Sequence, residues 1–359
     1  MVTLLRARIH CYFVFLLMNL LVGCAYLPLN HNYAGPPERP QELSEYYEKG
    51  DSYQKFVETA LEETPNFSLR RFVLSSEFGE TTIDFYQQDP GSKQLILVFP
   101  LLGGKNHISD YFAKYFAEHG FDAAVVHRNS DFKNPEYVDR LEELFRENVI
   151  RDRIAMDFFE KEFQKEEFGS FGISRGGINV AMTAGADSRL KYNVIAMGGT
   201  DLVDIFRKSS TKRLRFYKNT VMEKKKISEA QFYELLQQEI RTDPDELAKY
   251  MDARNTLLIL STFDSTVPFE LGLKLREQVG NPKTVFLAAD HYTSILYTGY
   301  VPLLLPFRKL SAFPMDYVET EALAFYREKF KRHRITPTLL PIRILQIPFN
   351  LIAHIVEAF

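Results

Sequence analysis

Residues 168–182 read FGSFGISRGGINVAM, and this stretch restricts the fold more than any other part of the chain. A strand-like run leads into Gly172-Ile173-Ser174-Arg175-Gly176, and a helix-like run follows. Glycines permit the tight backbone turn that joins a strand directly to a helix. The segment therefore predicts either a plain strand-to-helix turn or a turn that presents Ser174 as a nucleophile.

The middle of the chain alternates between strand-like and helix-like runs. The strand-like runs lie at 70–76, 81–87, 93–100, 121–128, 192–199, 255–264 and 283–290, and the helix-like runs at 107–120, 137–164, 178–186 and 269–279. A continuous apolar run such as KQLILVFP is typical of a parallel strand buried on both faces. The alternation predicts an α/β fold with a mostly parallel central sheet and helices on both sides.

Residues 201–253 interrupt this alternation because they contain no strand-like run. The segment looks helical and is rich in basic residues between Arg207 and Lys226. We interpret it as a helical cap inserted over the site, with the basic run facing solvent or an anionic surface. A plain solvated insertion is the alternative interpretation of the charges.

Two further side chains lie where parallel strands are expected to end. Asp264 comes just after the run NTLLILS, and His291 comes just after KTVFLA. Functional groups of open α/β sheets gather at the carboxyl ends of the strands, so Ser174, Asp264 and His291 are expected to meet. Acyl transfer by serine needs a hydroxyl, a histidine that accepts its proton and a carboxylate that orients the histidine. The order Ser, Asp, His predicts such a catalytic triad.

The other histidines fit this role less well. Only His291 follows both Ser174 and Asp264 at a junction between a strand and a loop. His107 comes after a Gly-Gly turn and is a candidate for the lining of the pocket. The remaining histidines of the exported chain lie at helix or strand ends, in a basic helix or in the terminal segments: His31, His119, His127, His333 and His354.

Residues from about 70 to 332 resemble the α/β-hydrolase superfamily. The resemblance rests on the G-x-S-x-G pattern around Ser174 and on the run from Asp264 to Pro268, D-x-x-V-P, which is similar to the acid loop common in that family. It implies an α/β-hydrolase fold with Ser174 as nucleophile, His291 as general base and Asp264 as the acid. It also implies hydrolysis through an acyl-enzyme, with no metal or organic cofactor.

The same resemblance suggests the groups that would bind the oxyanion. The run VFPLLGG takes the place of the family's oxyanion loop, which implies the backbone N–H groups of Leu102 and Arg175 as donors. The chain has Pro100-Leu101 where the family commonly has His-Gly, so the choice between Leu101 and Leu102 stays open. Asp201 is an alternative acid because some family members take the acid from the end of the preceding strand.

The N-terminus resembles a bacterial lipoprotein signal. Arg6 and Arg8 precede an apolar run that is shorter than the roughly 20 residues needed to span a membrane, and Leu21-Val22-Gly23-Cys24 resembles a lipobox. This predicts a signal peptide over 1–23 and a lipidated Cys24; an ordinary secretory signal is the alternative. The expected location is the cell envelope, at the outer membrane in a Gram-negative host because Ala25 follows Cys24.

Cleavage before Cys24 would remove Cys11, the only other cysteine. The exported chain would then have no disulfide and no cysteine metal site. Loss of Arg6 and Arg8 changes the formal net charge from −3 to −5, which does not favour nucleic acid as a partner.

Both ends of the exported chain have unusual composition. Residues 24–65 are predicted to form a proline-rich tether and a helix ahead of a hydrolase domain over 66–334. Residues 335–359 are mostly apolar but contain three prolines, which exclude a continuous spanning helix. This tail is expected to lie in a lipid interface or to fold back onto the domain.

These features together predict a membrane-tethered serine hydrolase that cleaves carboxylic esters or related acyl bonds. The expected partners are a small-molecule acyl ester or lipid substrate and a membrane, which would be bound through the lipid anchor and, as a second option, the C-terminal tail. A serine peptidase on the same fold is one alternative. The other is a catalytically inactive scaffold or binding protein of the envelope.

Overall fold

The computed structural model describes residues 26–101, 107–300 and 316–331. The predictions for Cys24, for Leu102 and for the tail 335–359 therefore lie outside the described residues. Among the helices that are described, none is long and apolar enough to cross a membrane.

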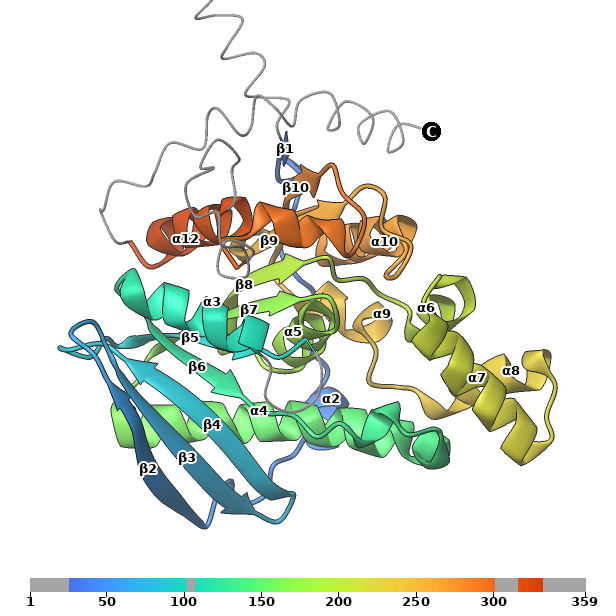
Figure 1. The fold of residues 1–359 in the computed structure, drawn as a ribbon, viewed down its shortest axis with the longest axis horizontal. Helices are drawn as coiled ribbons and strands as arrows, with labels where there is room; N and C mark the ends of the chain where they lie inside the picture. The colour runs from blue at the N-terminus through green and yellow to red at the C-terminus, as the bar shows by residue number, and fades with distance from the viewer. Residues whose placement is uncertain (1–25, 102–106, 301–315, 332–359) are drawn as a thin grey trace, which may run out of the picture.

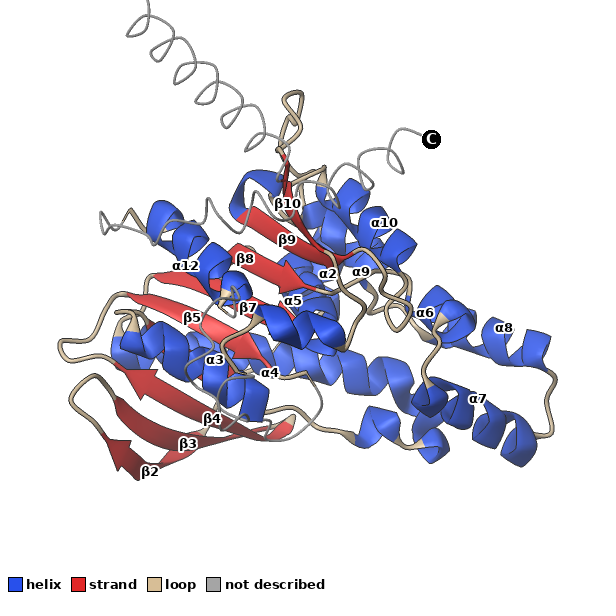
Figure 2. Ribbon diagram, turned by 45° about the horizontal axis from the view of Figure 1, so that its top comes forward, coloured by secondary structure: helices blue, strands red, loops and turns tan. Residues whose placement is uncertain are grey.

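One sheet organises the described chain (Figure 2). Its ten strands follow the order β1-β10-β9-β8-β7-β5-β6-β4-β3-β2. Pairing is parallel from β10 through β6, and antiparallel between β6 and β2 and between β1 and β10. The strands are β1 Tyr26–Leu27, β2 Lys55–Glu63, β3 Ser68–Ser76, β4 Gly79–Gln87, β5 Gln94–Phe99, β6 Asp122–Val126, β7 Glu167–Ile173, β8 Leu190–Ala196, β9 Thr256–Ser261 and β10 Lys283–Leu287.

Helices cover both faces of the sheet (Figure 1). One face carries α3 (His107–Glu118) and α12 (Tyr317–Lys329), and the other carries α4 (Leu141–Phe163), α5 (Arg175–Ala186) and α10 (Phe269–Val279). Strand β5 is apolar after its first residue because both of its faces are covered. Leu95 and Leu97 pack into one core, while Ile96 and Val98 pack into the other. Successive side chains of a strand point to opposite faces, so a strand covered on both sides has no polar position.

The segment expected to be a tether is instead part of the domain. Leu27 is only 3% exposed and pairs with β10, and α2 (Gln41–Tyr46) follows a short loop. Arg39 donates hydrogen bonds to the carbonyl oxygens of Gly185 at 2.8 Å, Ala184 at 3.0 Å and Tyr250 at 2.8 Å. Proline-rich composition indicates an extended chain, but an extended chain still packs onto a domain when its residues form hydrogen bonds and apolar contacts with that domain.

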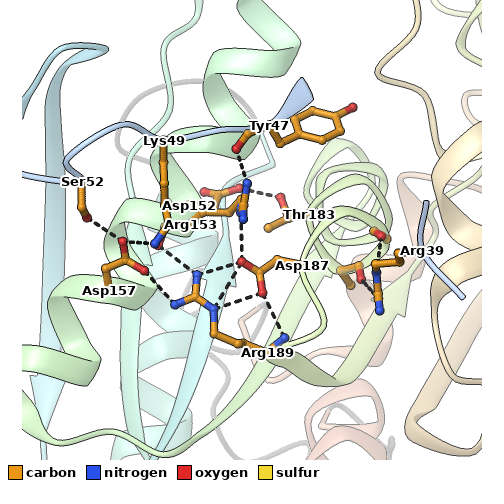
Figure 3. A network of polar contacts seen from close by, with 12 residues as sticks. Arg39, Tyr47, Lys49, Ser52, Asp152, Arg153, Asp157, Thr183, Asp187 and Arg189 are labelled. Atoms are coloured by element: carbon orange, nitrogen blue, oxygen red, sulfur yellow. Dashed lines mark hydrogen bonds and ion pairs between the residues drawn. The ribbon is translucent and has the colours of Figure 1, made fainter. Parts of the chain in front are cut away.

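A polar network continues this attachment (Figure 3). Arg153 on α4 donates to the carbonyl oxygen of Tyr47, and Ser52 donates to Asp157 at 2.6 Å. Beyond it, β2 pairs with β3 as an edge strand whose residues are all exposed. Residues on both sides of the predicted boundary at residue 66 therefore pair in one sheet within the described part of the chain. Strand β2 was missed because its apolar residues come in adjacent pairs instead of alternating with polar ones: Phe56, Val57, Ala60 and Leu61.

Residues 201–253 are helical, as the sequence predicts. They contain α6 (Leu202–Lys208), α7 (Lys212–Lys225), α8 (Glu229–Glu239) and α9 (Pro244–Leu247), between β8 and β9. Helix α8 begins with a capping box, in which Ser228 and Gln231 satisfy each other's backbone N–H groups. Helices α6, α7 and α8 extend from one end of the sheet (Figure 1).

Candidate active site

Ser174 occupies the turn between β7 and α5, with φ 54° and ψ −122°. A positive φ is strained for a residue with a side chain and costs on the order of 1–3 kcal/mol. A Cβ atom on Gly172 would lie 2.3 Å from the carbonyl oxygen of Gly176, and one on Gly176 would lie 2.4 Å from that of Phe99. Both contacts are with backbone atoms, so this turn requires glycine on either side of Ser174.

The three predicted side chains meet at the carboxyl ends of the strands. Ser174 Oγ lies 2.8 Å from His291 Nε2, and His291 Nδ1 lies 2.6 Å from Asp264 Oδ2. An ionised carboxylate only accepts hydrogen bonds, so Nδ1 carries the proton and Nε2 is free to accept that of Ser174. The structure thus forms a continuous hydrogen-bonded chain from hydroxyl to carboxylate.

Both carboxylate oxygens of Asp264 are held by hydrogen bonds. Its Oδ1 accepts hydrogen bonds from the backbone N–H groups of Thr266 at 2.8 Å and Val267 at 3.0 Å, while Oδ2 contacts His291. The side chain is nearly buried. A carboxylate held by two backbone donors keeps one orientation, so the imidazole that it contacts is also held in place.

Asp201, the alternative acid, has other partners. Its carboxylate caps α6 by accepting from the backbone N–H of Asp204 at 3.0 Å, and it pairs with Lys274 at 2.8 Å. The structure therefore selects Asp264 rather than Asp201 as the partner of His291. Two other histidines have partners elsewhere: His119 contacts the carbonyl oxygen of Tyr115, and His127 contacts Asp84.

The start of α5 contains one of the two backbone N–H groups that were expected to bind the oxyanion. Arg175 is the first residue of α5, so its backbone N–H has no acceptor within the helix. The N-terminus of a helix also favours negative charge. Leu102 lies outside the described residues, whereas Leu101 is described and lines the cavity beside Ser174.

A cavity of about 700 Å³ opens beside Ser174 and His291. Apolar residues of its lining come from the strand ends, α4, α5, the loop before α10 and the cap: Ile173, Met197, Leu141, Phe145, Ile178, Val267, Leu202, Ile205, Phe206, Leu214 and Tyr217. His107, which was expected to line the pocket, does not belong to the lining. The sequence did not identify the α4 and cap residues as pocket residues because helical periodicity does not distinguish a core contact from a cavity wall.

Cationic side chains in this cavity were also missed. Lys133, Arg175, Lys212 and Arg213 belong to the lining. The only sequence signal was the basic composition of 207–226, which we interpreted as solvent-facing or surface-binding. Part of that run is indeed paired at the surface, where Lys224 contacts Glu136 at 2.6 Å.

Comparisons with known proteins agree with this geometry. A model of the prolyl oligopeptidase family matches residues 106–287, which is 182 of the 359 residues. The matched region contains Ser174 and Asp264 and ends shortly before His291. No curated protein matches the chain.

Several solved structures share the fold at low sequence identity. An acetyl xylan esterase from a Paenibacillus species is 15% identical, with a TM-score of 0.56 over 71% of this chain and 92% of that one. An acetyl xylan esterase from a Thermoanaerobacterium species is 14% identical, with a TM-score of 0.55 over 82% and 96%. Pyrococcus horikoshii acylaminoacyl peptidase is 17% identical, with a TM-score of 0.53 over 79% of this chain and 45% of that one. The fold is that of an α/β-hydrolase.

Proposed function

The chain belongs to the prolyl oligopeptidase family of serine hydrolases, and from this we propose that it hydrolyses carboxylic esters, with Ser174 as the nucleophile. The observation that carries the proposal is the hydrogen-bonded chain from Ser174 through His291 to Asp264, with distances of 2.8 Å and 2.6 Å. Nucleophile, base and orienting acid are all within hydrogen-bond reach in one structure.

The first half of the reaction forms an acyl-enzyme. Ser174 Oγ attacks the ester carbonyl carbon while His291 Nε2 takes the hydroxyl proton. Asp264 stabilises the imidazolium that results. His291 then returns the proton to the departing alkoxide, and the alcohol leaves. Water repeats the sequence on the acyl-enzyme, releasing the carboxylic acid and restoring Ser174.

The tetrahedral intermediates carry a negative oxygen that needs donors. We assign the backbone N–H of Arg175 as one donor, because it lies at the start of α5 directly after the nucleophile. The loop after β5, at Leu101 or Leu102, is the proposed second source. Loss of one such donor typically costs about 3–4 kcal/mol of transition-state stabilisation.

The cavity supports ester substrates over peptides. Its walls are mostly apolar, and no Asp or Glu is among the described residues that line it. An acyl chain fits such a wall, whereas a free peptide amino terminus would find no carboxylate to neutralise it.

Short 4-nitrophenyl esters test this proposal. We expect the wild-type protein to hydrolyse 4-nitrophenyl butyrate and to react covalently with a fluorophosphonate probe at Ser174, and the Ser174→Ala variant to do neither. The melting temperature of the variant serves as the control for folding. Equal activity of both proteins would refute Ser174 as nucleophile, and a wild-type protein that neither reacts with the probe nor turns over esters would indicate an inactive scaffold.

Peptide hydrolysis is the second candidate, because the matching family model is named for oligopeptidases. The same triad would act on an amide, with His291 protonating a leaving amine. Comparison of 4-nitrophenyl butyrate with acetyl-alanine 4-nitroanilide discriminates the two functions. A higher kcat/KM for the anilide would favour the peptidase.

We further propose that the protein is anchored to a membrane of the cell envelope through a lipid on Cys24. The support is the lipobox-like run Leu21–Cys24 behind a basic and apolar start. Tyr26 is already part of the sheet edge, and two residues extend at most about 7 Å. The anchor would therefore hold the β1 edge of the domain close to the membrane. Cys24→Ser should release the protein from the membrane fraction and abolish labelling by an alkynyl fatty acid.

A further inference from the structure

The cavity beside Ser174 is lined by positive charge without a counter-charge. Four cationic side chains belong to the lining, and no Asp or Glu does: the cations are Lys133, Arg175, Lys212 and Arg213. The two internal segments outside the described residues, 102–106 and 301–315, contain no Asp or Glu in their sequence.

These four cations also lack partners within the part of the chain that the structure describes. The ion pairs and side-chain hydrogen bonds of residues 26–101, 107–300 and 316–331 include none that involves them. Other cations of the same cap are paired: Lys224 contacts Glu136 at 2.6 Å, and Lys225 contacts Asp139 at 2.7 Å. Among the described residues, Lys212 and Arg213 at the start of α7 are thus unpaired beside the cavity, while Lys224 and Lys225 at its end are neutralised.

Arg175 is the most unusual of the four. Its guanidinium lies over the rings of Phe132, at 4.9 Å, and Phe145, at 4.5 Å, and its Nε is buried without a hydrogen-bond partner. Burial, and then the nearby cation Arg128, lower the pKa of Arg175 to about 9. Arg175 is therefore a cation in an apolar, electropositive surrounding.

Two buried carboxylates bear on these charges, and both are committed to other groups. Asp152 pairs with Arg128 and also accepts a hydrogen bond from the hydroxyl of Thr183 at 2.7 Å. Asp243 acts electrostatically on Arg175, but its carboxylate accepts hydrogen bonds from backbone N–H groups at 2.7 Å and 2.8 Å. Among the described contacts, neither carboxylate makes an ion pair or a hydrogen bond with Arg175.

The two aromatic rings do not replace an anionic partner. A cation–π contact contributes about 0.5–2 kcal/mol and engages the flat face of the guanidinium. The N–H donors of a guanidinium point outward in its plane, in a fork that matches two oxygens of a carboxylate or phosphate. The rings therefore orient Arg175 while leaving its N–H edge available to an anion in the cavity.

Lys133 and Arg213 form a second cationic pair nearer to solvent. Lys133 ends the short helix η1 (Asp131–Lys133), and Arg213 lies on α7. Burial, and then repulsion by Arg213, lower the pKa of Lys133. An anion between these two side chains would relieve their repulsion. A carboxylate or phosphate at Arg175 would likewise compensate the charge of that side chain.

We propose that the ester substrate carries an oxyanion group, a carboxylate or a phosphate, which binds Arg175 in this cavity with support from Lys133 and Arg213. The inference rests on the ester hydrolysis proposed above and specifies its substrate class: an acyl ester with a negatively charged half. Such a substrate supplies the counter-charge that the described cavity lacks.

Matched pairs of esters test this selectivity. One pair places the charge on the acyl half: mono(4-nitrophenyl) adipate against 4-nitrophenyl hexanoate. A second pair places it on the alcohol half: 3-(hexanoyloxy)benzoate against phenyl hexanoate, with 3-(hexanoyloxy)phenyl phosphate as the phosphate version. For at least one anionic ester, kcat/KM should exceed that of its neutral partner by about tenfold or more at low ionic strength.

Arg175→Met should bring this anionic-to-neutral ratio close to one, and Arg175→Lys should restore part of it. The ratio is the readout because the backbone N–H of Arg175 is also a proposed oxyanion donor, and a change there affects both esters of a pair. Arg215→Met is the matched control, since Arg215 lies on the same helix α7 but outside the cavity lining, and it should leave the ratio unchanged.

Arg213→Met tests the inference separately in case Arg175→Met does not fold. It should lower the anionic-to-neutral ratio of kcat/KM by a smaller factor than Arg175→Met does. Inorganic phosphate should inhibit the wild-type protein competitively and should inhibit Arg213→Met more weakly. A wild-type ratio of one or below for every pair would overturn the inference while ester hydrolysis stands. Absence of turnover with all esters, neutral ones included, would instead refute the proposed function.

Discussion

Single residues around Ser174 explain why this turn accepts so few residue types. Gly176 lies against the carbonyl oxygen of Phe99, and Gly172 lies against the backbone of Gly176. Close approach of backbone atoms leaves no room for a methyl group, because neither partner is the end of a flexible side chain. The pattern G-x-S-x-G is thus a packing requirement as much as a signature of chemistry.

Gly176→Ala should therefore destabilise the protein. A Cβ atom 2.4 Å from Phe99 O forces a backbone shift, and we expect a loss of about 2 kcal/mol or more in the free energy of unfolding. Urea unfolding measures the change. Gly91→Ala is the control, because the nearest atom to its Cβ belongs to the movable side chain of Gln87. Equal stability of the two variants would contradict this account of the turn.

Asp264→Asn tests the assignment of the acid. An amide in place of the carboxylate favours the wrong imidazole tautomer, so kcat for 4-nitrophenyl butyrate should fall on the order of 10³–10⁴-fold. Asp201→Asn is the matched control and should keep kcat within about threefold, because Asp201 caps α6 and contacts Lys274 instead of His291. The reverse result would make Asp201 the acid.

Among the elements, the N-terminal segment changes most between expectation and structure. Its prolines indicated a spacer, yet Arg39 reaches three carbonyl oxygens on α5 and near α9, and Tyr47 is buried with its hydroxyl 2.9 Å from Thr242. These contacts join the segment to the same body as the triad. An anchored protein would consequently sit close to its membrane.

Arg39→Met should show this attachment. It removes hydrogen bonds to three carbonyl oxygens, so we expect a loss of about 2–3 kcal/mol in the free energy of unfolding. Arg140→Met is the control, since Arg140 is exposed and its guanidinium pairs with Glu143 and lies over the ring of Tyr137, outside the N-terminal segment. If Arg39→Met unfolded like the wild-type protein, residues 26–47 would be a spacer after all.

At the scale of the whole molecule, the loop that carries His291 is connected to α12, which covers the same face of the sheet as α3. Glu319 on α12 accepts a hydrogen bond from the backbone N–H of Gly299 at 2.8 Å, and Gly299 lies just after that loop. Burial raises the pKa of Glu319 to about 8. The folded state therefore favours the protonated form of the Glu319 carboxyl group, although the backbone N–H of Gly299 needs an oxygen of this group as its acceptor.

The sign of the resulting pH dependence follows from linkage. Because the folded-state pKa of Glu319 is raised, its contribution to stability is present below the unfolded pKa near 4.3 and is lost as pH rises through about 8. From pH 5 to pH 8, the wild-type protein should lose stability relative to Glu319→Gln. Urea unfolding at several pH values measures this. Glu328→Gln, an exposed change on the same helix, should show no such trend, and a constant difference for Glu319→Gln would contradict the raised pKa.

The α/β architecture and the meeting of Ser174, Asp264 and His291 were predictable from the sequence. Buried parallel strands require uninterrupted apolar runs, as β5 shows, and a nucleophile turn requires glycines around Ser174. The acid and the histidine follow strands whose carboxyl ends must lie at one edge of a parallel sheet. Local chemistry and strand direction suffice for these features.

Only the tertiary structure decided between Asp264 and Asp201, attached residues 26–47 to the domain, and brought Lys133, Arg175 and Arg213 to one cavity. Each outcome depends on side chains from separate elements and on which of them remain unpaired after folding. Composition gives the number of charges in a segment but not their distances in space. Since electrostatic and hydrogen-bond energies depend on those distances, the selectivity that we propose for the cavity could be inferred only from the packed structure.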